Sequence, residues 1–465
     1  NHRPTWAGKA TLDRVIAKED KATLPWSLSA DLDVSNRAVL AKALEFHYGA
    51  EERPFTISGA ATLDLAAVPS FEAVLSARQI DLDRTLGAGP DKPVSLDGAL
   101  AAFGAAIAGL PVPSVPGRVG FDIPGVVVGG SIISDLRADL VTAASGWTID
   151  TLEATLPGKS SLTARGRLAT APIIGFDGDV TLASDQPATL IAWWAPNRPK
   201  VGLDPFRISA KVAASMDGLR LDEVDARLDE GRISGSLDFA PGVAGRKPRL
   251  TLALDADQLR LSDVQTVAGL ATGQGAGADV VVKAAVGALI AGDTRAEGFD
   301  VSASLVDATL DVDRLFVRSL SGARVTAAGT IRDVTTTPDG SIQMRVSAEK
   351  LDGIADLVRA LAPNAPVVGF LRDAAPHLGP ASIEGTVLAK ASGDGTDVRV
   401  ELNGSAAATD IRGELAFKGR VDAWDAADMS SDISLTGPDG AELMRQFGLE
   451  VPDVGQTGAG SLTLS

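Results

Sequence analysis

The chain has 465 residues and a formal net charge of −17, and 45% of its residues are hydrophobic. The acidic balance and the absence of a basic stretch argue against nucleic acid as a partner, because phosphate binding needs clustered Lys and Arg. The absence of cysteine excludes disulfides, thiolate metal sites and cysteine nucleophiles. The hydrophobic content is too high for a disordered chain, and with only 4% aromatics its apolar surface is mainly aliphatic.

A helical insertion is predicted at 94–113, where the run "LDGALAAFGAAIAGL" is too short to span a bilayer. The chain starts without an initiator Met and stops within a strand-like segment, "GSLTLS". We therefore expect a fragment of a longer protein, with any membrane anchor outside this sequence.

Five segments with alternating apolar and polar residues are each centred on a glycine, as in "RISGSLDF". Alternation with a period of two predicts a β-strand, and it places each glycine on the same face as the apolar residues two positions away. The central glycines are Gly59, Gly166, Gly235, Gly329 and Gly419.

A second alternating segment follows each glycine segment, so each pair is predicted to form an antiparallel hairpin. After several hairpins a short helix is expected, which ends at a shared Ala-Pro-Asn-x-Pro motif at 195–199 and 362–366. The whole chain, 1–465, is predicted to be one continuous repeating β-groove of about twenty strands. Its approximate units are 1–90, 115–200, 201–270, 278–366 and 380–450.

The predicted strands outnumber the helices that could cover them. An open sheet rarely exceeds about ten strands without curling or splitting. Separate sandwiches would need more linkers than the sequence offers, and a solenoid would need a regular short coil repeat that is absent. The expected fold is therefore mainly β with short helices, in a long, highly curved, mostly antiparallel sheet with an apolar interior.

Three stretches carry a resemblance to a known family: "GKATLDRVIAKEDKATLPWSLSADLDV", "LEATLPGKSSLTARGRL" and "RLTLALDADQLRLSDV". With the repeated hairpin and helix, they resemble the AsmA family of bacterial envelope proteins, which includes TamB-like and YhdP-like members. The resemblance covers the whole chain in pattern. It implies a periplasmic β-groove, an N-terminal anchor in the inner membrane, and the carriage of phospholipids between inner and outer membranes.

The functional hypothesis is that phospholipids or other acyl lipids lie along the apolar face, with partners in the inner and outer membranes. The repeat glycines on this face could deepen the groove, let the sheet bend, or mark bulges and turns. The candidate lining residues are Ile57, Leu63, Leu75, Leu162, Leu168, Leu182, Ile233, Leu237, Leu252, Leu254, Val325, Ile331, Val346, Leu415 and Val421.

Catalytic chemistry has little support in the sequence. The histidines His2, His47 and His377 are scattered without metal-ligand spacing, and "GDGTD" at 393–397 is a single copy rather than a calcium-binding repeat. We expect no catalytic residues, no metal and no cofactor, and hence no enzyme. Two rivals remain open: an outer-membrane assembly factor with a dry β core, and an enzyme on an elongated β scaffold.

Overall fold

The computed structural model divides the chain into two compact units, and each is described by itself. The N-terminal unit is Asn1–Asp229 and the C-terminal unit is Glu230–Ser465. The structure describes residues 5–14, 24–50, 52, 54–87, 92–108, 114–144, 146–170, 174–196, 202–228, 231–243, 246–264, 278–292, 294–320, 322–334, 336–352, 375, 378–392, 395–419, 428–446 and 458–464.

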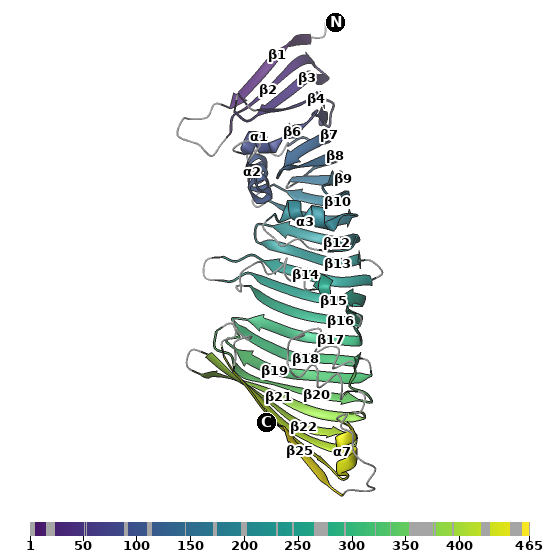
Figure 1. The fold of residues 1–465 in the computed structure, drawn as a ribbon. Helices are drawn as coiled ribbons and strands as arrows, with labels where there is room; N and C mark the ends of the chain where they lie inside the picture. Colours follow the sequence, from purple (N-terminus) through teal and green to yellow (C-terminus); the bar gives the residue numbers. More distant parts are fainter. Residues whose placement is uncertain are drawn as a thin grey trace. The chain divides into compact units, whose positions relative to one another are not determined.

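The N-terminal unit holds the first thirteen strands and three short helices (Figure 1). They are β1 (Thr5–Arg14), β2 (Trp26–Ser35), β3 (Ala38–Tyr48), β4 (Phe55–Asp64), β5 (Ser70–Ser76), β6 (Ile80–Asp81), α1 (Leu82–Leu86), α2 (Leu96–Ala108), β7 (Gly117–Val128), β8 (Ser131–Ala143), β9 (Gly146–Leu156), β10 (Ser160–Ala169), β11 (Gly175–Ser184), α3 (Pro187–Trp194), β12 (Phe206–Ser215) and β13 (Gly218–Leu228).

The C-terminal unit holds the twelve remaining strands and, among its described residues, the named helix α7. They are β14 (Gly231–Ala240), β15 (Arg249–Arg260), β16 (Asp279–Ala291), β17 (Thr294–Val306), β18 (Thr309–Leu320), β19 (Ala323–Arg332), β20 (Asp339–Ala348), β21 (Ala381–Ser392), β22 (Gly395–Ala406), β23 (Thr409–Gly419), β24 (Asp428–Gly437), α7 (Gly440–Gln446) and β25 (Gly460–Leu464).

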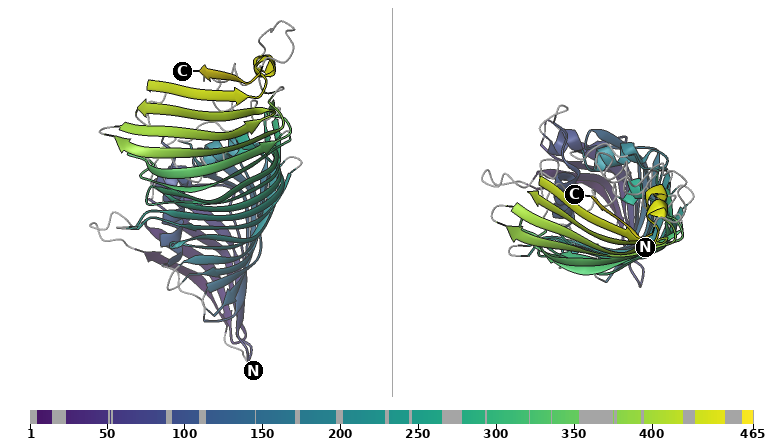
Figure 2. Two further views of the ribbon diagram at one scale, coloured as in Figure 1. Left: turned by 90° about the horizontal axis from the view of Figure 1, so that it is seen from below. Right: turned by 60° about the horizontal axis from the view of Figure 1, so that its bottom comes forward.

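Strands pair almost entirely in chain order and antiparallel, so each unit is a curved sheet that grows by adding hairpins (Figure 2). The exceptions are the parallel pairs that β7 makes with β5 and β6, and the parallel pair β15–β16. A parallel neighbour needs a longer crossover connection, and that of β5–β7 carries α1 and α2. The expected mainly β, mostly antiparallel fold is confirmed.

The five predicted hairpins are also confirmed. They are the antiparallel pairs β4–β5, β10–β11, β14–β15, β19–β20 and β23–β24. Side chains alternate along these strands: in β4 every second residue from Phe55 to Leu63 is half-buried, whereas those between are exposed. Local alternation therefore specified both the strands and the face that each side chain takes.

Charged residues on the exposed phase pair across neighbouring strands. Lys211 of β12 meets Glu223 of β13 at 2.5 Å, Arg345 of β20 meets Glu384 of β21 at 2.6 Å, and Arg137 of β8 lies 3.7 Å from Asp122 of β7. The side-chain hydrogen bond to Glu223, together with the negative charge of Glu223, raises the pKa of Lys211. Such solvent-exposed pairs contribute little to stability, so their main effect is to keep this face hydrated.

Two of the clusters of fully buried residues lie where strand ends meet short helices, at what we call the capped edge of each unit. In the N-terminal unit Leu190 and Trp193 of α3 and Ala99 of α2 pack against Val128 and Leu156, which end β7 and β9. Trp193 Nε1 also donates to the backbone oxygen of Val128 at 2.9 Å.

The C-terminal unit repeats this arrangement with other segments. Leu351, Ala375 and Leu378 pack against Leu320, which ends β18, and Ala323, which begins β19. At the start of β23, the Thr409 hydroxyl donates to Gln446 Oε1 of α7 at 2.6 Å. In both units, then, a large part of the described core lies along one row of strand ends, and a further cluster of the N-terminal unit, Ala77, Ile80, Ile123 and Val126, lies where β6 meets β7.

Candidate functional site

Within each unit, register turns the alternating phase of the strands into a continuous apolar face, which we call the apolar strip of that unit. In the N-terminal unit Leu28 of β2 pairs with Phe46 of β3, which pairs with Ile57 of β4. In the C-terminal unit Leu237 pairs with Leu252, and Leu252 with Val282 of β16. Because register is kept from strand to strand, apolar residues far apart in the sequence become neighbours.

The apolar strip is almost free of charge. Followed through the register from β2 to β13, no described position of this phase carries Asp, Glu, Lys or Arg. From β14 to β25, the charged residues of the phase in the described strands lie at the end of β15 and the start of β17: Arg260 pairs with Ile290, which pairs with Arg295, and Ala288 pairs with Glu297. Because removal of a charge from water is costly without a partner, a nearly uncharged face favours contact with apolar ligands over contact with ions.

The predicted lining residues share one environment. Val421 lies outside the described residues, and all the others are half-buried and on the apolar strip. In direct register stand the pairs Leu162 with Leu182, Leu237 with Leu252, and Val325 with Val346. Neighbouring side chains cover their flanks, while part of each stays open to solvent, unlike the fully buried residues of the capped edge.

The glycine that recurs on the apolar strip brings two backbones together. At Gly235 φ is +147°, and an added Cβ would overlap the backbone oxygen of Ala253 on the next strand. Gly59, Gly166 and Gly329 likewise have the next strand's backbone where a side chain would stand. This space is filled by protein, so these glycines let the strands approach closely rather than leave room for a ligand.

Three of these glycines also lie beside a β-bulge. The register of β3–β4 shifts next to Gly59, that of β9–β10 next to Gly166, and that of β18–β19 next to Gly329. A bulge bends its strand and increases the local twist, and a glycine on the neighbouring strand tolerates the resulting close approach. Of the readings left open by the sequence, the structure supports bending together with bulges.

Gly419 differs from the other four. It shares the phase of Leu415 but is the last residue of β23, opposite Thr396 in an unshifted register. The residue at mid-strand is Gly413, between Ile411 and Leu415. The sequence carries the same signal at Gly413, a glycine with apolar residues two positions away on each side, so the prediction at Gly419 did not identify the mid-strand glycine of β23.

One helix lies across part of the apolar strip. Leu96, at the start of α2, packs into the core at the capped edge, whereas Gly104 lies beside Ile174 Cδ1, just before β11 at the opposite edge. The start of α2 is held by the buried Asp83 of α1. Its Oδ1 accepts hydrogen bonds from the backbone amides of Val94, at 3.0 Å, and Gly129, at 2.9 Å.

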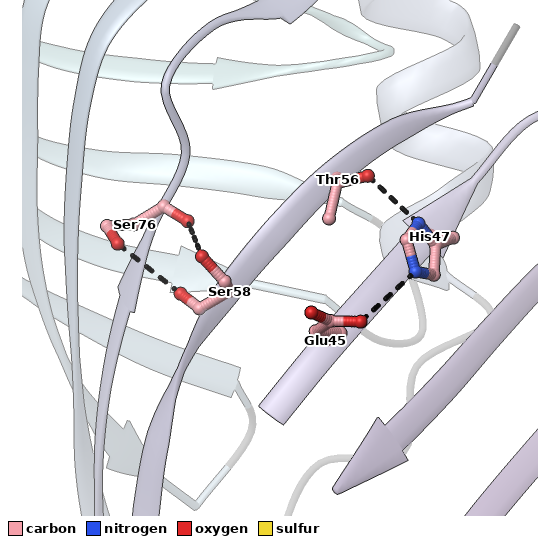
Figure 3. A network of polar contacts seen from close by, with 5 residues as sticks. All are labelled: Glu45, His47, Thr56, Ser58 and Ser76. Carbon is pink, nitrogen blue, oxygen red and sulfur yellow. Dashed lines mark hydrogen bonds and ion pairs between the residues drawn. The ribbon is translucent and has the colours of Figure 1, made fainter. Parts of the chain in front are cut away.

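A polar network lies on the opposite, charged face of the N-terminal unit (Figure 3). His47 Nδ1 lies 2.9 Å from the Thr56 hydroxyl, and its Nε2 lies 3.7 Å from Glu45 Oε2. The Ser58 hydroxyl donates to the backbone oxygen of Ser76 at 3.4 Å instead of approaching His47. Apart from the half-buried His47, these groups are solvent-exposed, so the contacts lie on an open surface and do not form an enclosed site.

Metal and membrane features can be stated only for part of the chain. No group of three or more His, Asp or Glu in the described residues could hold a metal ion. His2 and His377 lie outside that part. Within the same ranges, no helix has both the length and the hydropathy needed to cross a bilayer.

Comparison of the chain with known proteins adds no family assignment. No protein-family model, no curated protein and no solved structure matches it. The resemblance to the AsmA family therefore stays with the quoted sequence stretches, and the geometry of the apolar strip must carry the functional argument.

Proposed function

We propose that the protein is a lipid carrier of the bacterial envelope, in which the apolar strip holds phospholipid acyl chains during transfer between inner and outer membranes. The observation that carries this proposal is the half-buried, nearly uncharged apolar phase that continues through the register of each unit. The periplasmic location and an inner-membrane anchor outside this sequence follow from the resemblance and belong to the same proposal.

The energetics suit exchange of lipids. In water each exposed CH₂ group of an acyl chain costs about 0.8 kcal/mol, so a whole chain does not cross an aqueous gap readily. A chain that moves from a bilayer onto the strip passes between two apolar environments, and most of that cost is avoided. The charged side chains on the opposite face of the sheet keep that face hydrated.

The dimensions of the strip also suit an acyl chain. A strand segment of seven residues is about 23 Å long. One leaflet of a bilayer contributes about 15 Å of hydrocarbon thickness, half of the roughly 30 Å core. A chain can therefore lie along one strand, and adjacent strands about 4.8 Å apart offer successive positions.

The first test is to purify the protein without detergent and identify bound molecules by native mass spectrometry and lipid extraction. We expect phospholipid to accompany the folded protein. A stable, folded protein without lipid would contradict the proposal and favour an assembly factor with a dry core. That second candidate is favoured by α2, which already occupies part of the strip between the capped edge and Ile174.

A pair of neighbouring substitutions localises the binding. Leu252→Asp places a charge on the apolar strip, whereas Ala253→Asp places the same charge on the exposed face one residue away. We expect the first variant to lose most of the lipid crosslinked through a photoreactive group at position 254, and the second to keep it. Equal crosslinking in both folded variants would show that lipid does not bind there.

A further inference from the structure

In β1, the first strand of the N-terminal unit, one basic residue lies on the apolar phase. Arg14 is the last residue of β1 and pairs with Trp26 of β2. Trp26 pairs with Tyr48 of β3, and Tyr48 pairs with Phe55 of β4. Residues from four strands thus form one row across the apolar strip, with a cation at one end and a phenol within it.

The three rings of this row, together with Phe46 of the neighbouring row, form a continuous series of aromatic contacts. The centroids of Trp26 and Phe46 lie 6.1 Å apart, those of Phe46 and Tyr48 lie 6.4 Å apart, and those of Tyr48 and Phe55 lie 5.4 Å apart. Tyr48 is the one tyrosine of the chain. Tryptophan and tyrosine have an apolar body and a polar tip, which suits the boundary between lipid chains and their head groups.

The positive charge of Arg14 acts on the Tyr48 phenol across Trp26. Burial raises the pKa of Tyr48, and the positive charge of Arg14 acts in the opposite direction. The phenol is therefore protonated at neutral pH and can donate a hydrogen bond. Arg14 is exposed, and no carboxylate of the described residues forms an ion pair with it.

We propose that Arg14 and Tyr48 bind the anionic head group, a phosphate or carboxylate, of an amphiphile whose chain lies on the strip beyond them. This inference rests on the proposed function. The guanidinium offers a planar set of donors that matches a phosphate or carboxylate, and the phenol adds one more. From Trp26 the strip continues along β2 through Leu28 and Leu32 without a charge, so the row fixes which end of the lipid lies there.

The test compares two lipids with the same chains, phosphatidic acid and diacylglycerol, on the whole protein. Arg14→Gln removes the charge, and Tyr48→Phe removes the hydroxyl while it keeps the ring. We expect Arg14→Gln to weaken phosphatidic acid binding on the order of tenfold, because a hydrogen bond to a charged group is lost, and to leave diacylglycerol binding unchanged. Tyr48→Phe should have a smaller effect in the same direction.

Lys9→Gln is the matched control, because Lys9 lies on the same strand in the opposite phase, paired with Asp31. If Lys9→Gln and Arg14→Gln weakened phosphatidic acid binding equally, the effect would come from net charge alone, and the proposed head-group site would be overturned. Inorganic phosphate that binds as tightly as phosphatidic acid would indicate a free-anion site and overturn the lipid assignment. Binding of both lipids without any dependence on Arg14 would refute the head-group site and leave the strip intact, whereas binding of neither would refute both proposals.

Discussion

The capped edge and the apolar strip consist of similar aliphatic residues, yet they differ in what covers them. On β19, Ala323 is 0% exposed beneath Leu351, Ala375 and Leu378, whereas Val325, two residues along on the same face, is half-buried. Ala323 and Val325 lie on the same face of β19 and differ in their position along the strand. On this strand the tightly packed core lies at one end, and the apolar side chains of the middle stay partly open to solvent.

Replacement of a buried tryptophan at the capped edge should produce the largest effect. Trp193→Ala removes a ring that is 9% exposed together with its hydrogen bond to Val128, so we expect a loss of about 3–5 kcal/mol in the free energy of unfolding. Chemical denaturation, followed through the unfolding transition of the N-terminal unit, measures this loss. Trp194→Ala, at a ring that is 67% exposed, is the control and should change stability by less than about 0.5 kcal/mol.

Leu320→Ala and Leu237→Ala compare the two regions directly with one chemical change. Leu320 is 3% exposed at the capped edge, and its loss should cost about 2–5 kcal/mol. Leu237 is half-buried on the strip, so its loss should cost clearly less and reduce the amount of bound lipid instead. Equal destabilisation in denaturation experiments would mean that the strip is an ordinary core.

The repeated glycine allows a test of how the sheet bends. Gly235→Ala forces a side chain onto a backbone with φ of +147° and against the backbone of β15, and we expect it to cost about 1–3 kcal/mol. Gly202→Ala, where no atom lies within 4 Å of the added Cβ, is the control. Similar thermal unfolding of both variants would argue against the bend.

The smallest effect is expected on the charged face. Arg345→Gln removes the ion pair between Arg345 and Glu384. Both side chains are well exposed, so the substitution should lower the free energy of unfolding by at most about 1 kcal/mol. Most of this difference should vanish at 1 M salt, where charges are screened over about 3 Å. A large effect that salt does not alter would show that the outer face, too, helps to hold the fold.

The sequence predicted the strands and their faces because side-chain direction in a strand depends on local alternation, as in Ile233, Gly235 and Leu237. It did not predict the parallel pair β15–β16 or the row from Arg14 to Phe55. Both depend on register between segments that are distant in the sequence. It also could not show that α2 lies across the strip, because the apolar pattern of a helix does not reveal which surface the helix covers.

Pairing in chain order has a consequence for how such a sheet changes length. In the C-terminal unit β21 and β22 are bonded to each other and to their chain neighbours β20 and β23, so interactions are nearly one-dimensional. A hairpin can be gained or lost by duplication or deletion while the remaining ladders keep their register. The length of such a sheet across its strands can therefore change in steps of two strands, about 10 Å each, and no new hydrophobic core is needed for each step.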